Sequence, residues 1–362
     1  MAVKIAGKQG KYGIIRHNTA SAAATAFKAI GSTANQWTNP VLVATNFRTL
    51  LLTALTPQID PGVTIDNYNT TSQLGLNDEL SNFYVDGASG LVKLNFSALA
   101  DSNTMPALIL AAMQGYSSYT DLGGTYELVA TSGVKAGTID FNQGGGYTFG
   151  VCEKIGASAD DGTLLQNGIV DSLNLVIDFN AKGVGRLVNL SGTFVFKSVA
   201  YDQTLTGTFV SPTILPYGDT AAWTIATFTS DSVDLSSVCI RRIEVTINNN
   251  TTSNCSTTSG APNQYDLKPE YLVNIIVDHN TLTEKIRGDF KAGATVDINF
   301  NNGLVSTASG YLAIDAPFCK MTSDPSVYNE DFYGYNLQLK AYQSSTTSPI
   351  TISVVTSLDW AF

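Results

Sequence analysis

Apolar and polar residues alternate with a period of two in several separate stretches of the chain. The alternation is clear over residues 92–96, 173–179, 243–247, 296–300 and 337–341. Successive side chains of a β-strand point to opposite faces of a sheet, so this pattern predicts strands that bury one face. Gly, Asn and Asp residues between these stretches supply turns. The pattern therefore predicts a mostly β protein.

One segment, residues 104–114, shows the period of a helix instead. Its apolar residues fall at positions i, i+3, i+4, i+7 and i+8 and form one stripe, which we expect to pack against a sheet. Thr104 is suited to cap the helix, Pro106 to its first turn and Gly115 to its end. The stripe consists of Met105, Leu108, Ile109, Ala112 and Met113.

A second helix is predicted over residues 281–291. Leu282, Ile286 and Phe290 form a narrower apolar stripe. Thr281 and Glu284 have the spacing of a capping box, in which each side chain bonds the other residue's backbone N–H. Gly293 is suited to end the helix.

Each predicted helix follows a strand and precedes several further strands, so the two halves of the chain share one pattern without sharing sequence. We interpret this as a duplication: two tandem β-sandwich or open-barrel folds, each with one short flanking helix. The predicted units are residues 1–200, with a basic N-terminal arm, and residues 201–362. The segment 211–216 is suited to link them.

Charge is unevenly distributed along the chain. The 20 basic and 30 acidic residues give a net charge of −10, but the first 59 residues contain six bases and no acid. The remaining residues therefore carry a net charge of −16. The basic arm could contact nucleic acid or the acidic body of a neighbouring copy, or it could be a solvated terminus. Its candidate contact residues are Lys4, Lys8, Lys11 and Arg16.

Residues that support catalysis are scarce. The chain has two histidines and four widely separated cysteines, and only 14% of its residues are charged. No phosphate-binding, hydrolase or zinc-ligand motif occurs. We therefore expect no enzyme activity, cofactor or metal. We also find no secretory signal or membrane-spanning stretch, and expect reduced thiols in a cytosolic environment.

The polar run over residues 248–264 follows a clear strand and is too long for a tight hairpin turn. Connections of this length are usually functional or disordered. In an assembly, we expect it to be an arm that reaches toward a neighbouring subunit.

The order and spacing of several segments resemble those of bacteriophage tail tube proteins, the major tail subunits of long-tailed phages, in their larger form. The resemblance covers most of residues 90–355. The segments that carry it are Gly90–Gly115, Thr138–Asn180, Gly185–Val199, Val238–Asn249, Pro269–Ala292 and Tyr335–Val355.

The resemblance implies a structural virion protein that forms stacked rings and so builds the hollow tail tube for genome delivery. Strands of neighbouring subunits would pair edge to edge into a continuous inner barrel. With a duplicated chain, three copies would form a pseudo-hexameric ring; otherwise six would form a hexamer. Implied partners are the tape measure, tail terminator and tail-tip proteins, with assembly in the host cytoplasm.

Double-stranded DNA must pass through such a tube without sticking. An acidic lining would repel phosphates, whereas a basic lining would bind them through counterion release. We expect the polar face of the alternating strands to be the lumen surface, with three acids on it: Asp178, Glu244 and Asp297.

Other functions fit the same sequence. Another virion β protein, such as a capsid decoration or baseplate component, would form discrete oligomers rather than filaments. A carbohydrate-binding adhesin module could stack sugars on exposed Trp37, Trp223 or Trp360. An enzyme of a type without a familiar motif is a further alternative.

Overall fold

The structure is a computed structural model of the chain. It describes residues 10–15, 46–49, 59–60, 64–67, 83–86, 92–102, 104–132, 137–140, 149–155, 162–181, 187–196, 198–203, 208–210, 223–231, 233–255, 262–329, 333–344 and 347–357. Within these residues the protein is mostly β, with one large antiparallel sheet and two short helices, which confirms the predicted class. All five alternating stretches lie in strands, apart from Phe179 at the end of the second.

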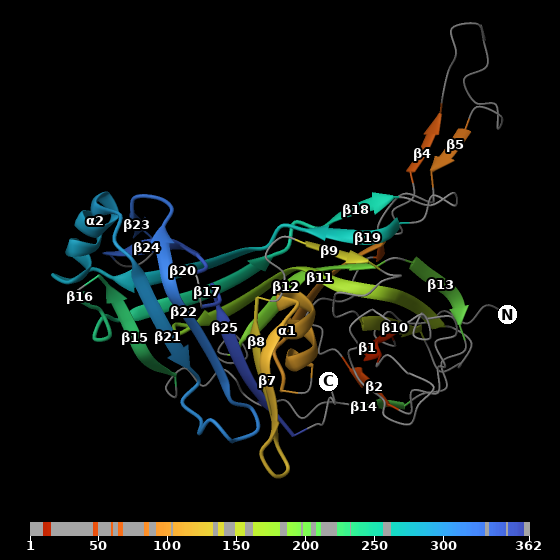
Figure 1. Cartoon of the computed structure of the whole chain (residues 1–362), viewed down its shortest axis with the longest axis horizontal. Helices are drawn as coiled ribbons and strands as arrows, with labels where there is room; N and C mark the ends of the chain where they lie inside the picture. Colours follow the sequence, from red (N-terminus) through yellow and green to blue (C-terminus); the bar gives the residue numbers. More distant parts are fainter. Residues whose placement is uncertain are drawn as a thin grey trace, which may run out of the picture.

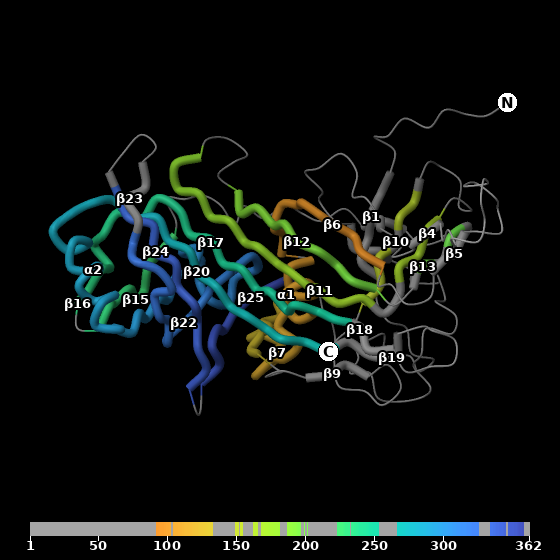
Figure 2. The backbone as a smooth tube through the Cα atoms, turned by 90° about the horizontal axis from the view of Figure 1, so that it is seen from above, coloured from red at the N-terminus to blue at the C-terminus, as the bar shows by residue number. Residues whose placement is uncertain are grey.

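The large sheet folds over into two layers. Figure 2 shows the strands of the first layer side by side. In order they are β6 (Val92–Leu99), β12 (Asn189–Phe196), β11 (Gly162–Asp178), β17 (Ile240–Asn248), β20 (Glu270–Asp278) and β24 (Tyr333–Ala341). Short strands extend this layer at its two sides: β3 (Ile59–Asp60) on β6, and β23 (Ser326–Asn329) on β24.

The second layer packs across the core from the first, and β22 joins the two. Near its end, β22 pairs with β24 of the first layer, whereas its beginning pairs with β25 of the second. In order, the second layer consists of β16 (Val233–Asp234), β15 (Thr224–Ser230), β21 (Val296–Asn301), β22 (Leu312–Met321), β25 (Thr351–Thr356), β8 (Tyr126–Thr131) and β7 (Tyr116–Asp121).

A second group of strands lies at the other end of the elongated molecule (Figure 1). The first half of β11 leaves the large layer and pairs there with β10 and β13. This group contains β10 (Phe149–Ile155), β13 (Ser198–Gln203), β1 (Gly10–Ile15), β2 (Asn46–Thr49) and β14 (Thr208–Val210). A separate hairpin is formed by β4 (Thr64–Asn67) and β5 (Phe83–Asp86).

Helix α1 (Met105–Met113) lies between the two layers and contacts β11 and β17 on one side and β8 and β25 on the other. The helix was predicted to bury one stripe, but all nine of its residues are buried, because sheet covers it on both sides. The predicted cap is also shifted. Thr104 makes no side-chain cap bond; instead Asp101, itself fully buried, accepts hydrogen bonds from the backbone N–H and the hydroxyl of Thr104. Gln114, with φ 58°, ends the helix rather than Gly115.

Helix α2 (Thr283–Ala292) lies at the far end of the molecule, beside β15 and β23 (Figure 1). Only Thr283 and Ile286 are buried. The predicted capping box is displaced by one residue. Asn280 Oδ1 accepts the N–H groups of Leu282 and Thr283, and the Thr283 hydroxyl accepts the N–H of Asn280. Gly293, with φ 68°, ends the helix as predicted.

Strands from the two sides of residue 200 are neighbours in one sheet. β11 pairs with β17 over seven residues, and β8 pairs with β25. Side chains from both halves also form one hydrophobic cluster around α1. The structure therefore does not show two separate tandem units.

The polar run 248–264, whose length favoured a loop, contains strands, and its contact with a neighbouring subunit stays a prediction. β18 (Thr252–Cys255) and β19 (Pro262–Leu267) form a hairpin, and β19 also pairs with β9 (Gly137–Asp140). Strand pairing satisfies backbone groups whatever the side chains are, so a polar sequence without clear alternation can still form a sheet.

Candidate functional site

The outward face of the first layer is broad and rich in amide and hydroxyl groups. We call it the amide face. Alternation in β6, β12, β11, β17, β20 and β24 places one polar set outward while the other set forms the core, and the register brings the polar side chains into rows across the strands. The face contains Asn95, Ser97, Asn189, Ser191, Thr193, Ser172, Asn174, Thr246, Asn248, Asn274, Asn336 and Gln338.

Charges on the amide face balance. Its bases are Lys93, Arg241, Arg242 and Lys340, and its acids are Asp178, Glu244, Glu270 and Asp278. Three of the four acids form ion pairs with these bases, and all six partners are partly exposed. The eight charged residues named on these six described strands therefore sum to a formal charge of zero, although the chain carries −10.

The three ion pairs have well-defined geometry. Arg241 donates two hydrogen bonds to Asp278, at 2.6 and 2.9 Å, and this contact lowers the pKa of the Asp278 carboxyl. Arg242 Nη2 lies 3.2 Å from Glu244 Oε2. The Lys340 ammonium donates to Glu270 Oε1, which raises the pKa of Lys340.

Neutral side chains add further bonds across the amide face. Asn174 Nδ2 donates to Glu244 Oε1 at 2.6 Å, so this carboxylate is bonded from two strands. The Thr193 hydroxyl donates to Asn95 Oδ1 at 2.8 Å. These bonds hold the side chains in place on the sheet.

The outward face of the second layer has a different character, and we call it the acidic face. It carries Glu127 on β8, Asp297 on β21 and Asp315 on β22, among Thr, Ser and Asn side chains. Within the described part of the chain, no base lies at ion-pair distance from these three carboxylates. Partial burial raises the pKa of both Asp297 and Asp315, and the charge of Asp315 raises that of Asp297 further.

Replacing Asp315 by asparagine should raise the free energy of unfolding at neutral pH. A carboxyl whose folded-state pKa is above its unfolded value of 3.8 favours the folded state when protonated, and that contribution is lost as pH rises through the folded pKa. The gain should therefore grow from pH 3.8 upward and level off above the folded pKa. Denaturant titrations at several pH values test this, and a gain that is independent of pH would contradict it.

The structure separates the three predicted lumen acids. Asp178 and Glu244 lie on adjacent strands of the amide face. Asp297 lies on the acidic face of the other layer, next to Thr229 of β15. Alternation identified the polar side of each strand but not the layer to which the strand belongs.

Of the predicted basic contact residues, Lys11 lies in β1, whose backbone pairs with both β10 and β2. Lys4, Lys8 and Arg16 lie outside the described residues.

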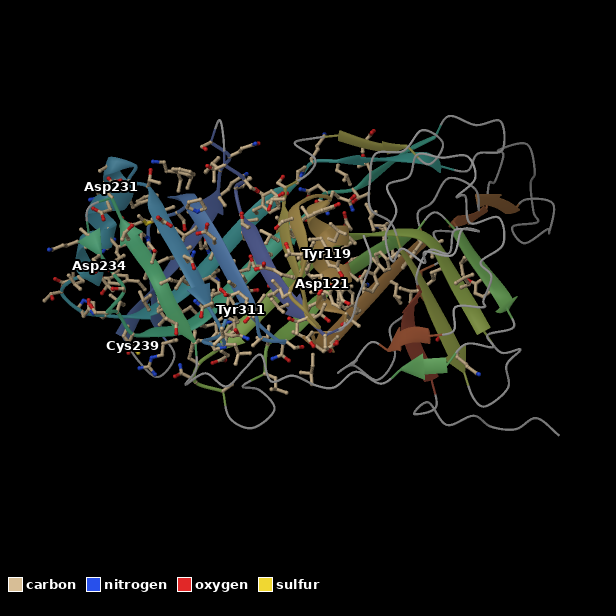
Figure 3. All side chains as sticks on the ribbon, turned by 60° about the horizontal axis from the view of Figure 1, so that its bottom comes forward. Tyr119, Asp121, Asp231, Asp234, Cys239 and Tyr311 are labelled. Atoms are coloured by element: carbon tan, nitrogen blue, oxygen red, sulfur yellow. The ribbon has the colours of Figure 1, made fainter. Side chains whose placement is uncertain are left out.

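β7 forms an outer edge of the second layer. In the described part of the chain it pairs only with β8. Tyr119 and Asp121 of this strand are labelled in Figure 3, near the middle of the molecule. Ser117, Thr120 and Asp121 are exposed, and Tyr116 is 37% exposed. An edge of this kind presents backbone N–H and C=O groups to which another strand can pair.

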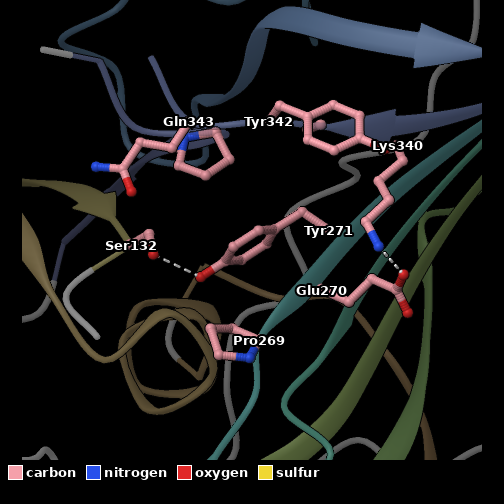
Figure 4. Close-up of a pocket in the computed structure, with 9 residues that line it drawn as sticks. Ser132, Pro269, Glu270, Tyr271, Lys340, Tyr342 and Gln343 are labelled. Carbon is pink, nitrogen blue, oxygen red and sulfur yellow. Dashed lines mark hydrogen bonds and ion pairs between the residues drawn. The ribbon is translucent and has the colours of Figure 1, made fainter. Parts of the chain in front are cut away.

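A pocket of about 190 Å³ lies where β20, β24 and the end of β8 meet (Figure 4). The Tyr271 hydroxyl donates to Ser132 Oγ at 2.9 Å, and the Lys340–Glu270 pair forms another part of the wall. Burial raises the pKa of Tyr271, so this phenol stays protonated at neutral pH. The pocket thus adjoins one edge of the amide face.

Two cysteine thiols are described, and both are free. Cys319 is buried in the core, and burial raises its pKa to about 12, so it is not a nucleophile at neutral pH. Cys239 (labelled in Figure 3) is exposed beside Asp278 at the end of β20, and its pKa is raised by partial burial and by its contact with Asp278.

Of the three tryptophans considered for sugar stacking, the one that is described, Trp223, packs on the core. Trp223 lies with its ring centroid 5.9 Å from that of Phe300, which is buried. Trp37 and Trp360 lie outside the described residues.

No protein-family model matches the chain, and no curated protein is significantly similar to it in sequence. Neither described helix has the length and apolarity needed to cross a bilayer. Among the described residues, no group of three His, Cys, Asp or Glu side chains is placed to hold a metal ion.

Proposed function

We propose that this chain is a structural virion protein that assembles through its sheet edges into the stacked rings of a phage tail tube, and that it acts without catalysis or a cofactor. The observation that carries the proposal is the wide antiparallel sheet, which combines a charge-balanced polar face with an outer strand, β7, that among the described residues pairs only with β8. The exposed positions of β7 offer an edge to which a strand of a second subunit can pair. The polar face is suited to a surface past which DNA slides, and the segment order described above supports the same function.

The finer proposal is that the chain contains two copies of the tube fold. β6, α1, β7 and β8 follow one another along the chain, as do β20, α2, β21 and β22. In each case a later strand returns to the first strand of the set: β12 pairs with β6, and β24 with β20. The helices differ, since α1 is wholly buried and α2 is mostly exposed. On this proposal three chains form a pseudo-hexameric ring.

In this function the partners are further copies of the chain and the tape measure, terminator and tail-tip proteins. The assembled protein belongs to the virion, after assembly in the host cytoplasm. Double-stranded DNA is a passing cargo and is not retained.

Electron microscopy of the concentrated, purified protein tests the proposal, and hollow tubes or stacked rings are expected. Thr120→Lys places a charge on the exposed β7 edge and should reduce tube formation at least about tenfold, because lysine disfavours edge pairing. Thr281→Lys makes the same change at an exposed position next to α2 and should leave tubes intact.

Discrete closed oligomers that never stack, both alone and after mixing with purified tail tips, would contradict the tube. That result would favour a capsid decoration or baseplate protein. Tubes that form equally well from both lysine variants would exclude the β7 edge as a contact.

A further inference from the structure

Three carboxylates on the amide face each bond a base on the same face. They are Glu244 beside Arg242, Glu270 beside Lys340, and Asp278 beside Arg241. The last two pairs join residues far apart in the sequence. Without these acids the same surface would carry Lys93, Arg241, Arg242 and Lys340 against the single charge of Asp178.

A surface that carries several unpaired bases is the usual means by which proteins hold DNA. Lysine and arginine displace the cations condensed on the phosphates, and this release drives binding without regard to sequence. Arginine also forms two parallel hydrogen bonds to a phosphate. In this structure the two donors of Arg241 that a phosphate would use are bonded to Asp278.

The three ion pairs contribute little to the free energy of folding. Each partner keeps between 23% and 38% of its side chain exposed. Exposed ion pairs contribute about 0–1 kcal/mol to folding. A neutral residue at each position would hold the sheet nearly as well, so stability alone does not explain three such pairs on one face.

We propose that Glu244, Glu270 and Asp278 mask the bases of the amide face and so keep it from retaining double-stranded DNA. This inference rests on the proposed function, in which DNA passes this face. The face then avoids DNA through local pairing of its charges, whereas the three carboxylates of the acidic face have no base at ion-pair distance among the described residues.

The test is DNA binding by the purified chain, measured by fluorescence anisotropy with a labelled duplex. A triple variant, Glu244→Gln/Glu270→Gln/Asp278→Asn, should bind at low salt, where the unmodified chain does not. With three bases freed, its affinity should fall about 40-fold between about 50 and 200 mM salt, since the logarithm of the binding constant falls by about 0.9 per phosphate contact for each unit of log salt.

The matched control is Glu127→Gln/Asp297→Asn/Asp315→Asn on the acidic face. Each triple variant removes three negative charges and changes the formal net charge from −10 to −7. The control should not bind DNA. Adding Arg241→Gln, Arg242→Gln and Lys340→Gln to the first variant should abolish its binding.

Equal binding by the two triple variants would overturn the inference, because net charge alone would then explain it. Absence of binding by the first variant, with thermal unfolding showing that it is folded, would also overturn it. DNA binding and thermal unfolding are both measured on the unassembled chain, so their results do not depend on whether electron microscopy shows tubes. A chain that forms no tubes but gains DNA binding would refute the tube and not the masking.

Discussion

Replacing Gly192 by alanine is expected to destabilise the fold by more than about 3 kcal/mol, beyond the usual range for an overpacked core. Gly192 lies in β12 between β6 and β11. A Cβ atom at this position would lie 2.0 Å from the backbone oxygen of Ser172 and 3.1 Å from the Phe96 ring. Ser172 follows the irregularity in β11, so relief of the clash requires the central strands to separate.

Gly288→Ala is the matched control for this substitution. Gly288 lies in the exposed part of α2, and a Cβ atom there meets nothing within 4 Å. Alanine should stabilise this helix by about 0.5–1 kcal/mol. Urea titrations of both variants give the two free energies. A Gly192→Ala protein as stable as the unmodified chain would show that β11 and β12 can shift to accommodate a methyl group.

Replacing Asn249 by alanine is expected to cost about 2–5 kcal/mol, because it leaves two buried carbonyl groups without their donor. Asn249 is 1% exposed. Its side-chain amide donates to the carbonyl of Ala112, at 2.9 Å, and to that of Val170, at 2.7 Å. The first carbonyl belongs to the last turn of α1, where no helical partner remains. The second lies at the irregularity in β11.

Asn248→Ala is the control for this prediction. Asn248 lies on the partly exposed amide face, and its replacement removes no described hydrogen bond to the core. Its cost should stay under about 1 kcal/mol. Denaturant titration and hydrogen exchange of the α1 amides test the pair. Equal losses in the two variants would show that Asn249 does not hold the helix to the sheet.

Local sequence patterns predicted the local structure well. Alternation located the strands because a half-exposed sheet demands it, as in β17 and β21. The helical period located α1 and α2, and Gly293 identified the end of α2. The caps were misplaced because Asp101 and Asn280 precede their helices and compete with the threonines that were proposed.

Long-range pairing could not be predicted from the same patterns. Two strands with the same alternation can lie in either layer, so Asp297 was grouped with Glu244 although they lie on opposite faces. The Arg242–Glu244 pair is visible in the sequence as two residues on one side of a strand. The partners of Asp278 and Glu270 depend on which strands become neighbours, and local patterns do not show this.

The position of β25 has a consequence for how the chain reaches its folded state. β25 covers α1 and pairs with both β8 and β22, so Thr351 joins Thr131 from a distant part of the sequence. Until β25 has formed, the side of α1 that faces the second layer is covered only in part, and α1 is composed almost entirely of apolar residues. Contacts so distant in sequence form slowly, and exposed apolar surface promotes aggregation in the meantime. During synthesis, α1 is therefore incompletely covered until more than two hundred further residues have been made.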